Sequence, residues 1–264
     1  MIYLNMNNLF NLNPVLLALF ATLFTYLVTA LGASLVFFFK KMNQKVLDVM
    51  LGLASGIMIA AAFWSLILPA ISLCEEMGKT PYIIPAFGFL LGGLFIICSD
   101  VLLQKCVKID EKKKRSILLS SAVTLHNIPE GMAIGVAFGA LAFSDKEGGL
   151  LACCMLALGI GIQNFPEGVC VSMPLRKNGE TRLKSFLVGQ ASGIVEPIAG
   201  VLGALFALAV QNILPYMLTF SAGAMIAVVC SELIPDAFKD NKVLASLGVI
   251  FGFIIMMVLD IAFG

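Results

Sequence analysis

Two polar hexapeptides interrupt the otherwise apolar middle of the chain. His126 begins the sequence His-Asn-Ile-Pro-Glu-Gly, and Gln163 begins the sequence Gln-Asn-Phe-Pro-Glu-Gly. His126 and Glu130 are four residues apart, as are Gln163 and Glu167, so on a helix the members of each pair share one face. An imidazole, two carboxylates and amide oxygens can therefore converge on one point. That mixture of donors suits divalent first-row metals.

Each hexapeptide also contains a proline, Pro129 or Pro166. Proline lacks a backbone donor and collides with the carbonyl four residues earlier, so we expect a kink at each point and a freed carbonyl oxygen. An ionised glutamate inside a bilayer is costly unless it is paired or neutralised, and neither hexapeptide contains Lys or Arg. Glu130 and Glu167 therefore need protons or a bound cation. Glu196, which also precedes a proline, is a further acid of this kind.

The elements that must position these residues are membrane-spanning helices. The 264-residue chain is 60% hydrophobic and 12% charged, which is outside the soluble range, and its net charge of +1 argues against a nucleic-acid partner. Apolar runs of roughly 20 residues recur from end to end, and in lipid such runs must be helical. We therefore expect one all-α domain over residues 1–264, surrounded by membrane lipid. The eight expected spans are 14–39, 46–73, 82–103, 116–143, 149–175, 184–210, 214–238 and 243–263.

The basic residues divide unevenly between the two sets of loops. Fifteen of the 17 Lys and Arg residues lie next to the ends of spans one, three, five and seven, whereas only Lys79 and Lys146 lie on the opposite side. Short cytoplasmic loops are enriched in Lys and Arg. Both termini are therefore expected outside the cytoplasm, in a plasma membrane or a bacterial inner membrane. An odd number of spans would break this alternation.

Spans two and seven share a local pattern. Residues 56–60 read Gly-Ile-Met-Ile-Ala, residues 223–227 read Gly-Ala-Met-Ile-Ala, and a Leu-Ile pair follows each at the same offset. Because these spans run in opposite directions, the match indicates an inverted repeat, a common transporter architecture. We expect spans one to three and six to eight to form the two repeats, flanking the kinked spans four and five. Four glycines are candidates for close helix contacts: Gly88, Gly92, Gly248 and Gly252.

With these motifs the sequence resembles the ZIP (Zrt-, Irt-like) metal transporter family, whose fourth helix carries an H-N-x-P-E-G motif and whose fifth carries a related one. Residues 54–66 of span two and Gln163 at the start of the second motif resemble the GufA-like branch of that family. The resemblance covers essentially the whole chain. It implies eight spans, outside termini and a binuclear metal centre halfway across the membrane.

The resemblance also assigns ligands by motif position. One metal site would use His126, Glu130, Gln163 and Glu167. Met58 in span two would lie near enough to contribute a thioether.

The second site would use Asn127, Asn164 and Glu196, with the glutamates of the two motifs bridging the metals. At Asn164 this chain has a neutral amide where the branch commonly has Asp, which weakens the expected second site. Ser65 and Glu232 match positions associated with the outer and inner ends of the pathway.

The function implied by the resemblance is uptake of Zn²⁺, or of a similar divalent ion, toward the cytoplasm by alternating access. Cd²⁺, Fe²⁺, Mn²⁺ and Co²⁺ suit the same donors, and the metal is cargo, with no cofactor expected. The family also implies a homodimer in which spans one, four, five and six move against the rest. One alternative is a channel-like conductor whose carboxylates form a selective constriction. The other is an intramembrane metalloenzyme, which typically needs a second His, whereas His126 is the chain's only one. We expect no enzymatic activity.

Overall fold

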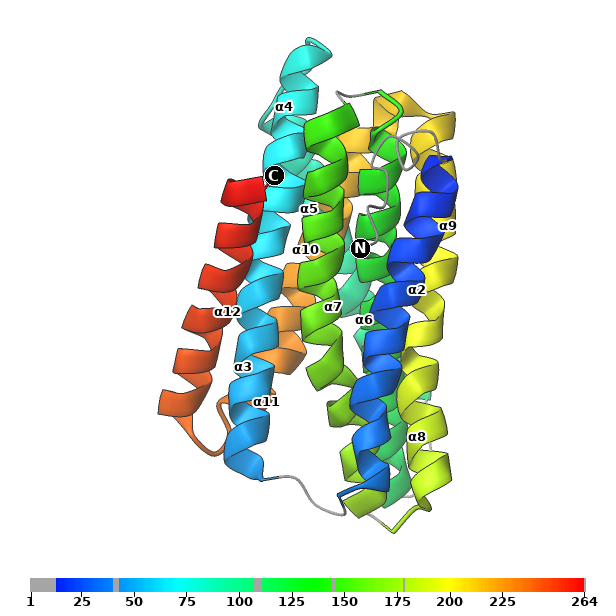
Figure 1. Cartoon of the computed structure of the whole chain (residues 1–264), viewed down its shortest axis with the longest axis vertical. Helices are drawn as coiled ribbons and strands as arrows, with labels where there is room; N and C mark the ends of the chain where they lie inside the picture. The colour runs from blue at the N-terminus through cyan, green and yellow to red at the C-terminus, as the bar shows by residue number, and fades with distance from the viewer. Residues whose placement is uncertain (1–12, 40–42, 107–110, 144–145, 178, 264) are drawn as a thin grey trace, which may run out of the picture.

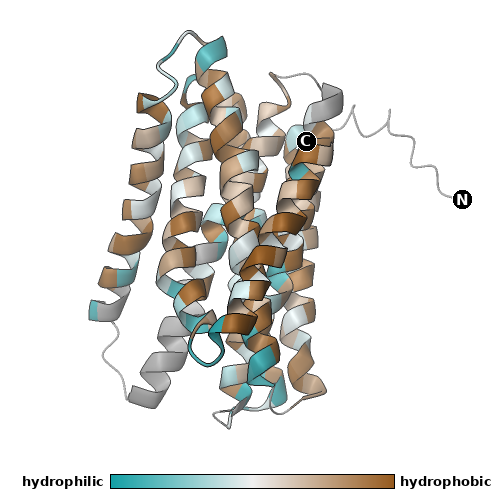
Figure 2. Cartoon of the chain, turned by 90° about the vertical axis from the view of Figure 1, so that its left-hand side faces the viewer, coloured by the Kyte–Doolittle hydropathy of each residue, from teal (hydrophilic) through white to brown (hydrophobic). Residues whose placement is uncertain are grey.

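The computed structural model describes residues 13–39, 43–106, 111–143, 146–177 and 179–263. Within these residues all regular structure is helical, and the long helices run side by side along one axis (Figure 1). Seven of the described helical segments are long and apolar enough to cross a membrane. The remaining long segment, α6 (Glu111–Ala140), contains the first hexapeptide. Hydrophobic residues cover most of the bundle's height and hydrophilic ones gather at its ends (Figure 2), so the chain is a multi-pass membrane protein.

The eight spans occur in the expected order, several of them as two or three consecutive helical segments. Spans one to three are α2 (Pro14–Ala33) with η1 (Ser34–Phe37), α3 (Gln44–Ala61) with η2 (Ala62–Ile67) and α4 (Leu68–Glu76), and α5 (Ile83–Cys106). Spans four and five are α6 and α7 (Lys146–Lys177). Span six is α8 (Arg182–Ala191) with η3 (Ser192–Ile194) and α9 (Val195–Ala209), and the short helix η4 (Gln211–Ile213) follows it. Span seven is α10 (Leu214–Val228) with η5 (Val229–Leu233) and α11 (Ile234–Ala237). Span eight is α12 (Lys242–Phe263).

The fourth and fifth helices are longer than their apolar runs. α6 begins at Glu111 rather than at residue 116, and α7 begins at Lys146 rather than at residue 149. Charged residues with long side chains are good helix formers, so the helix continues after the chain leaves the hydrocarbon. Both helices also continue through Pro129 and Pro166, and the kinks expected there stay a prediction.

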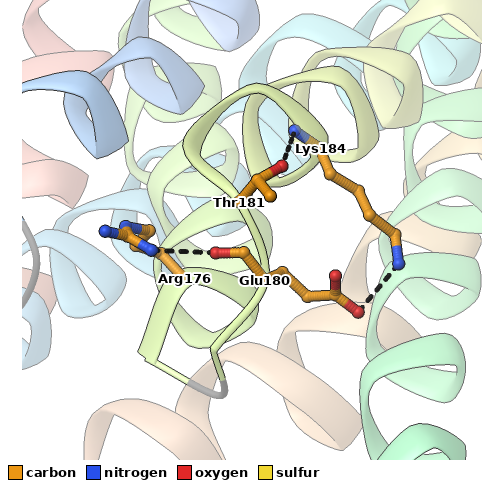
Figure 3. A network of polar contacts seen from close by, with 4 residues as sticks. All are labelled: Arg176, Glu180, Thr181 and Lys184. Atoms are coloured by element: carbon orange, nitrogen blue, oxygen red, sulfur yellow. Dashed lines mark hydrogen bonds and ion pairs between the residues drawn. The ribbon is translucent and has the colours of Figure 1, made fainter.

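Polar contacts fix the corner at which α7 turns back into α8 (Figure 3). Thr181 caps α8 by accepting a hydrogen bond from the backbone N–H of Lys184. The guanidinium of Arg176 donates to the backbone oxygen of Glu180 at 2.9 Å, and the Glu180 carboxylate pairs with the Lys184 ammonium at 2.8 Å. These charged groups anchor the corner at the end of the bundle.

Spans two and seven occupy matching environments, as an inverted repeat requires. A Cβ atom added at Gly56 in α3 would lie 2.1 Å from the carbonyl oxygen of Val249 in α12. A Cβ atom added at Gly223, 167 positions later in α10, would lie 2.0 Å from the carbonyl oxygen of Phe89 in α5. Span two therefore packs on span eight as span seven packs on span three. The glycines expected to allow close contacts lie at these same interfaces: Gly88, Gly92, Gly248 and Gly252.

Repeat-related packing also holds for spans one, four, five and six. A Cβ atom at Gly131 in α6 would lie 2.4 Å from the carbonyl oxygen of Glu196 in α9, and one at Gly168 in α7 would lie 2.0 Å from that of Thr29 in α2. Thr29 and Glu196 are again 167 positions apart. Each glycine that ends a hexapeptide therefore seats its helix against span one or span six. The inverted repeat around spans four and five is confirmed.

Each of the two repeats also contains a π-helical turn at the same place. The turn η2 begins at Ala62 in span two, and the turn η5 begins at Val229 in span seven, 167 positions later. A proline follows each turn, at Pro69 and Pro235, and removes one backbone donor. Such π turns re-aim side chains and are frequent at functional sites, and these two contain Ser65 and Glu232.

Candidate metal centre

The donor residues expected from the two hexapeptides lie in the interior of the bundle. Helix α6 packs closely against α9 and also contacts α7, so polar residues on these three helices can meet. Each of these side chains is at most 2% exposed, and they are Asn127, Glu130, Gln163, Asn164, Glu167 and Glu196. Six buried polar side chains inside a membrane bundle need partners, and their partners define the chemistry of the site.

Gln163 and Glu130 contact each other directly across the α6–α7 interface. The amide nitrogen of Gln163 donates a hydrogen bond to Glu130 Oε1. The amide oxygen of Gln163 then points elsewhere, is buried, and accepts no hydrogen bond from any described residue. Two of the four donors expected for the first site therefore contact each other, and one buried amide oxygen has a lone pair free of any described donor.

Asn127 and Asn164 make equivalent contacts in the two halves of the repeat. Asn127 Nδ2 donates to the backbone oxygen of Ser192 at 3.0 Å, and Asn164 Nδ2 donates to the backbone oxygen of Thr25 at 3.3 Å. Thr25 and Ser192 are 167 positions apart. In both asparagines the Oδ1 atom is buried and accepts no hydrogen bond within the described part of the chain.

These orphaned amide oxygens fit a cation. A buried carbonyl-type oxygen without a donor is destabilising, by about 1–3 kcal/mol in soluble proteins. Three such oxygens, from Asn127, Gln163 and Asn164, belong to the same two hexapeptides as the buried carboxylates of Glu130 and Glu167. A divalent ion would satisfy the amide oxygens and neutralise the two carboxylates at once.

Glu196 has its own set of donors, and two of them were missed by sequence reasoning. The hydroxyl groups of Thr25 and Thr29 in α2 donate to its two carboxylate oxygens, and Asn164 Nδ2 lies 2.9 Å from both. A signal for the threonines was present, because Thr22, Thr25 and Thr29 recur at helical spacing in an otherwise apolar span and all are fully buried.

For Met58 and His126 the structure shows the helix that carries each residue. Met58 is fully buried in α3, which packs against α7. The backbone of His126 belongs to α6, but its side chain lies outside the described part of the structure. Among the described side chains no three His, Cys, Asp or Glu groups are arranged to hold a metal ion by themselves.

A small cavity of about 30 Å³ lies beside Glu167. Glu232 and Asp236 of span seven and Cys170 of α7 contribute to its lining, together with apolar residues. Glu232, which the family resemblance places on the inner part of the pathway, thus shares a cavity with the second hexapeptide.

Ser65 contacts a polar residue at the opposite end of the bundle. Its hydroxyl donates to Asp260 Oδ1 in α12 at 2.6 Å. Asp260 is 9% exposed, and its Oδ2 atom has no hydrogen-bond partner among the described residues. Sequence reasoning identified Ser65 but not its partner, because Asp260 lies near the end of the last apolar run.

An inverted repeat of membrane-crossing helices around buried carboxylate and amide side chains is typical of a membrane transport protein. The model of the ZIP Zinc transporter family matches residues 108–260, and the chain belongs to this family.

Named relatives extend the match over nearly the whole chain. The chain is 36% identical to Zinc transporter ZIP11 of Xenopus tropicalis, covering 96% of this chain and 98% of that protein. It is 34% identical to Zinc transporter GufA of Myxococcus xanthus, covering 93% of this chain and 98% of that protein. It is also 32% identical to Zinc transporter ZIPB of Bordetella bronchiseptica over 90% of this chain. The resemblance to the ZIP family and to its GufA-like branch is confirmed.

Proposed function

We propose that the chain carries a divalent transition metal, zinc first, across the membrane through the donors of the two hexapeptides. The observation that carries this proposal is the set of buried amide oxygens on Asn127, Gln163 and Asn164 that accept no hydrogen bond from the described residues. Relatives at 32–36% identity are named zinc transporters, which supports zinc as the cargo. Cd²⁺, Fe²⁺, Mn²⁺ and Co²⁺ remain candidate competitors because mixed nitrogen and oxygen donors accept all of them.

The donors of the proposed transport site have different roles. Glu130 and Glu167 supply the charge that neutralises the cation, and Gln163, which holds Glu130 in place, supplies a neutral oxygen. His126 lies one helical turn from Glu130 and would supply a nitrogen, while Met58 would supply a weak sulfur donor from the facing repeat. Neutral and weak donors limit affinity, which lets a carrier release its ion.

The inner half of the route would run from Glu167 through the cavity that Glu232 and Asp236 line. Carboxylates along this cavity would lower the cost of moving a cation away from the site. The outer half would pass Ser65 and Asp260, the polar pair at the other end of the bundle. The repeat-related packing of the two halves supports alternating access around the central site.

The orientation proposed for this route places both termini outside the cytoplasm. The N-terminal end of α2 and the C-terminal end of α12 lie at the same end of the bundle (Figure 1), and most Lys and Arg residues adjoin the opposite end of the spans. Uptake toward the cytoplasm then runs from Ser65 to Glu232. The plasma or bacterial inner membrane is the proposed location, and a homodimer stays a prediction.

The two alternative functions have less support. The relatives are named transporters, which favours a carrier over a channel and over an enzyme. A carrier saturates with metal concentration, because each ion must wait for a conformational cycle. A channel would conduct without such a limit.

The experiment is uptake of radioactive zinc into proteoliposomes that contain the purified full-length chain. The double variant His126→Ala with Glu130→Ala should reduce uptake to the level of protein-free liposomes. Glu180→Ala is the matched control, because Glu180 is a glutamate that makes only a partly exposed ion pair with Lys184 at the α7–α8 corner (Figure 3). Uptake that saturates in the wild type and in the control, but is lost in the double variant, supports the proposal. Undiminished uptake by the double variant would remove these ligands from it.

A further inference from the structure

The carboxylate of Glu196 is enclosed by donors from two other spans. Thr25 donates to Oε2, the Thr29 hydroxyl lies 3.5 Å from Oε1, and Asn164 Nδ2 lies 2.9 Å from both oxygens. Glu196 is fully buried and lies in the first turn of α9, where the helix dipole favours a negative charge. Neutral groups of the protein itself therefore satisfy both oxygens of this carboxyl group.

The orientation of the Asn164 amide follows from its neighbours. Its nitrogen also lies 3.3 Å from the backbone oxygen of Thr25, so both of its N–H groups have only oxygen acceptors within reach. Rotating the amide by half a turn would place Oδ1 against those oxygens, which repel it. Asn164 therefore presents N–H groups to Glu196, and an amide N–H group cannot bind a metal ion.

The other half of the repeat lacks the corresponding acid. The position that matches Glu196 is Thr29, and the amide that matches Asn164 is Asn127. Asn127 donates to the backbone oxygen of Ser192 rather than to a carboxylate. Glu196 is thus the acid on which a second cation would depend, and it is the acid that Asn164 already contacts.

Building on the transport site proposed above, we propose that the amide of Asn164 takes the place of a second cation, so that the centre binds one metal ion per chain. A second ion between Asn164 and Glu196 would displace the N–H groups that now lie there and would leave them without acceptors. Glu196 is then a positioning residue. Its carboxyl group holds α2, α7 and α9 together through these hydrogen bonds, beside the transport site, instead of binding cargo.

The test uses two measurements on the purified full-length protein. Equilibrium dialysis gives the number of zinc ions bound per chain, and thermal unfolding gives the apparent melting temperature. The wild type should bind one ion. Glu196→Gln should also bind one, because Glu196 lies outside the proposed ligand set. It should melt at a lower temperature, because one of the two oxygens that now accept from Asn164 and the threonines becomes an NH₂ group, which cannot accept. Asn164→Asp places two carboxylates together and should bind two ions.

The matched control exchanges the two groups. Asn164→Asp combined with Glu196→Gln keeps one carboxylate and one amide in the same volume, so it should bind one ion and recover the melting temperature lost in Glu196→Gln. Two ions in the wild type, one of them lost in Glu196→Gln, would overturn the inference, as would a single ion in Asn164→Asp. A wild type that binds no zinc would instead overturn the transport site itself, and this inference with it.

Discussion

Replacing Gly168 by alanine tests how closely the second hexapeptide must approach span one. The added Cβ atom would lie 2.0 Å from the backbone oxygen of Thr29 and 2.8 Å from the backbone nitrogen of Ala33. Both neighbours belong to the backbone of α2, so neither can rotate away. Carbon and carbonyl oxygen atoms touch at about 3.3 Å, and α2 would therefore have to move by about 1.3 Å, taking that contact distance as the target.

The energetic consequence has two opposing parts. Overpacking of this kind typically costs about 1–3 kcal/mol, occasionally more, while alanine is better than glycine in a helix interior by about 1 kcal/mol. The movement also lengthens the 3.3 Å hydrogen bond from Asn164 to Thr25 beyond any useful distance. We expect a net loss of about 1–2 kcal/mol, which for a chain of this size lowers the melting temperature by about 2–8 °C, and a lower rate of zinc uptake.

The assay is thermal unfolding of the purified chain in detergent, compared with Gly93→Ala. The nearest atom to a Cβ at Gly93 is the backbone oxygen of Gly223, at an ordinary contact distance of 3.6 Å. Gly93→Ala should therefore be neutral or stabilising by about 0.5–1 kcal/mol. If Gly168→Ala stabilises the protein as Gly93→Ala does, the close contact between α2 and α7, and the placement of the second hexapeptide that rests on it, are wrong.

Three further substitutions probe other parts of the bundle. Gly92→Ala should lower the melting temperature, because its Cβ would lie 1.9 Å from a backbone oxygen of α10; an unchanged value in thermal unfolding would contradict the close α5–α10 packing. Tyr26→Phe removes a hydrogen bond to Gln190 and should cost about 1 kcal/mol while leaving zinc uptake intact, and loss of uptake would give this pair a role in transport. Ser65→Ala leaves the buried Asp260 without its 2.6 Å donor; we expect about 1.5–3 kcal/mol of destabilisation and slower uptake at limiting zinc, and normal values for both would exclude the pair from the route.

Much of this fold could be predicted from the sequence, because lipid imposes helices on every long apolar run. The number and order of the spans follow from those runs, and the repeat follows from the pattern that begins at Gly56 and Gly223. Helix ends could not be predicted as well, because α6 and α7 extend through charged residues from Glu111 and Lys146. The π-helical turns were also not predicted, since a single extra residue per turn leaves no periodic mark in so short a segment.

Part of the candidate site could be predicted from the sequence and part of it could not. Residues that share one helix face, such as Gln163 with Glu167, could be grouped from their spacing, and the structure buries both of them. The partners of Glu196 could not be predicted, because they depend on how α2 packs against α7 and α9. The recurring threonines of span one signalled a polar face, but nothing in their own helix named the carboxylate that Thr29 would contact.

The central claim is that Glu130 and Glu167 together bind the transported ion. The most direct measurement is the equilibrium affinity of the purified chain for Zn²⁺ when both glutamates are replaced by glutamine, with Glu180→Gln as the control. The two carboxylates lie in the bundle interior, whereas Glu180 lies in the α7–α8 corner. The account predicts that the double variant loses the bound ion and that the control keeps it with wild-type affinity. A double variant that still binds zinc with wild-type affinity would contradict the account.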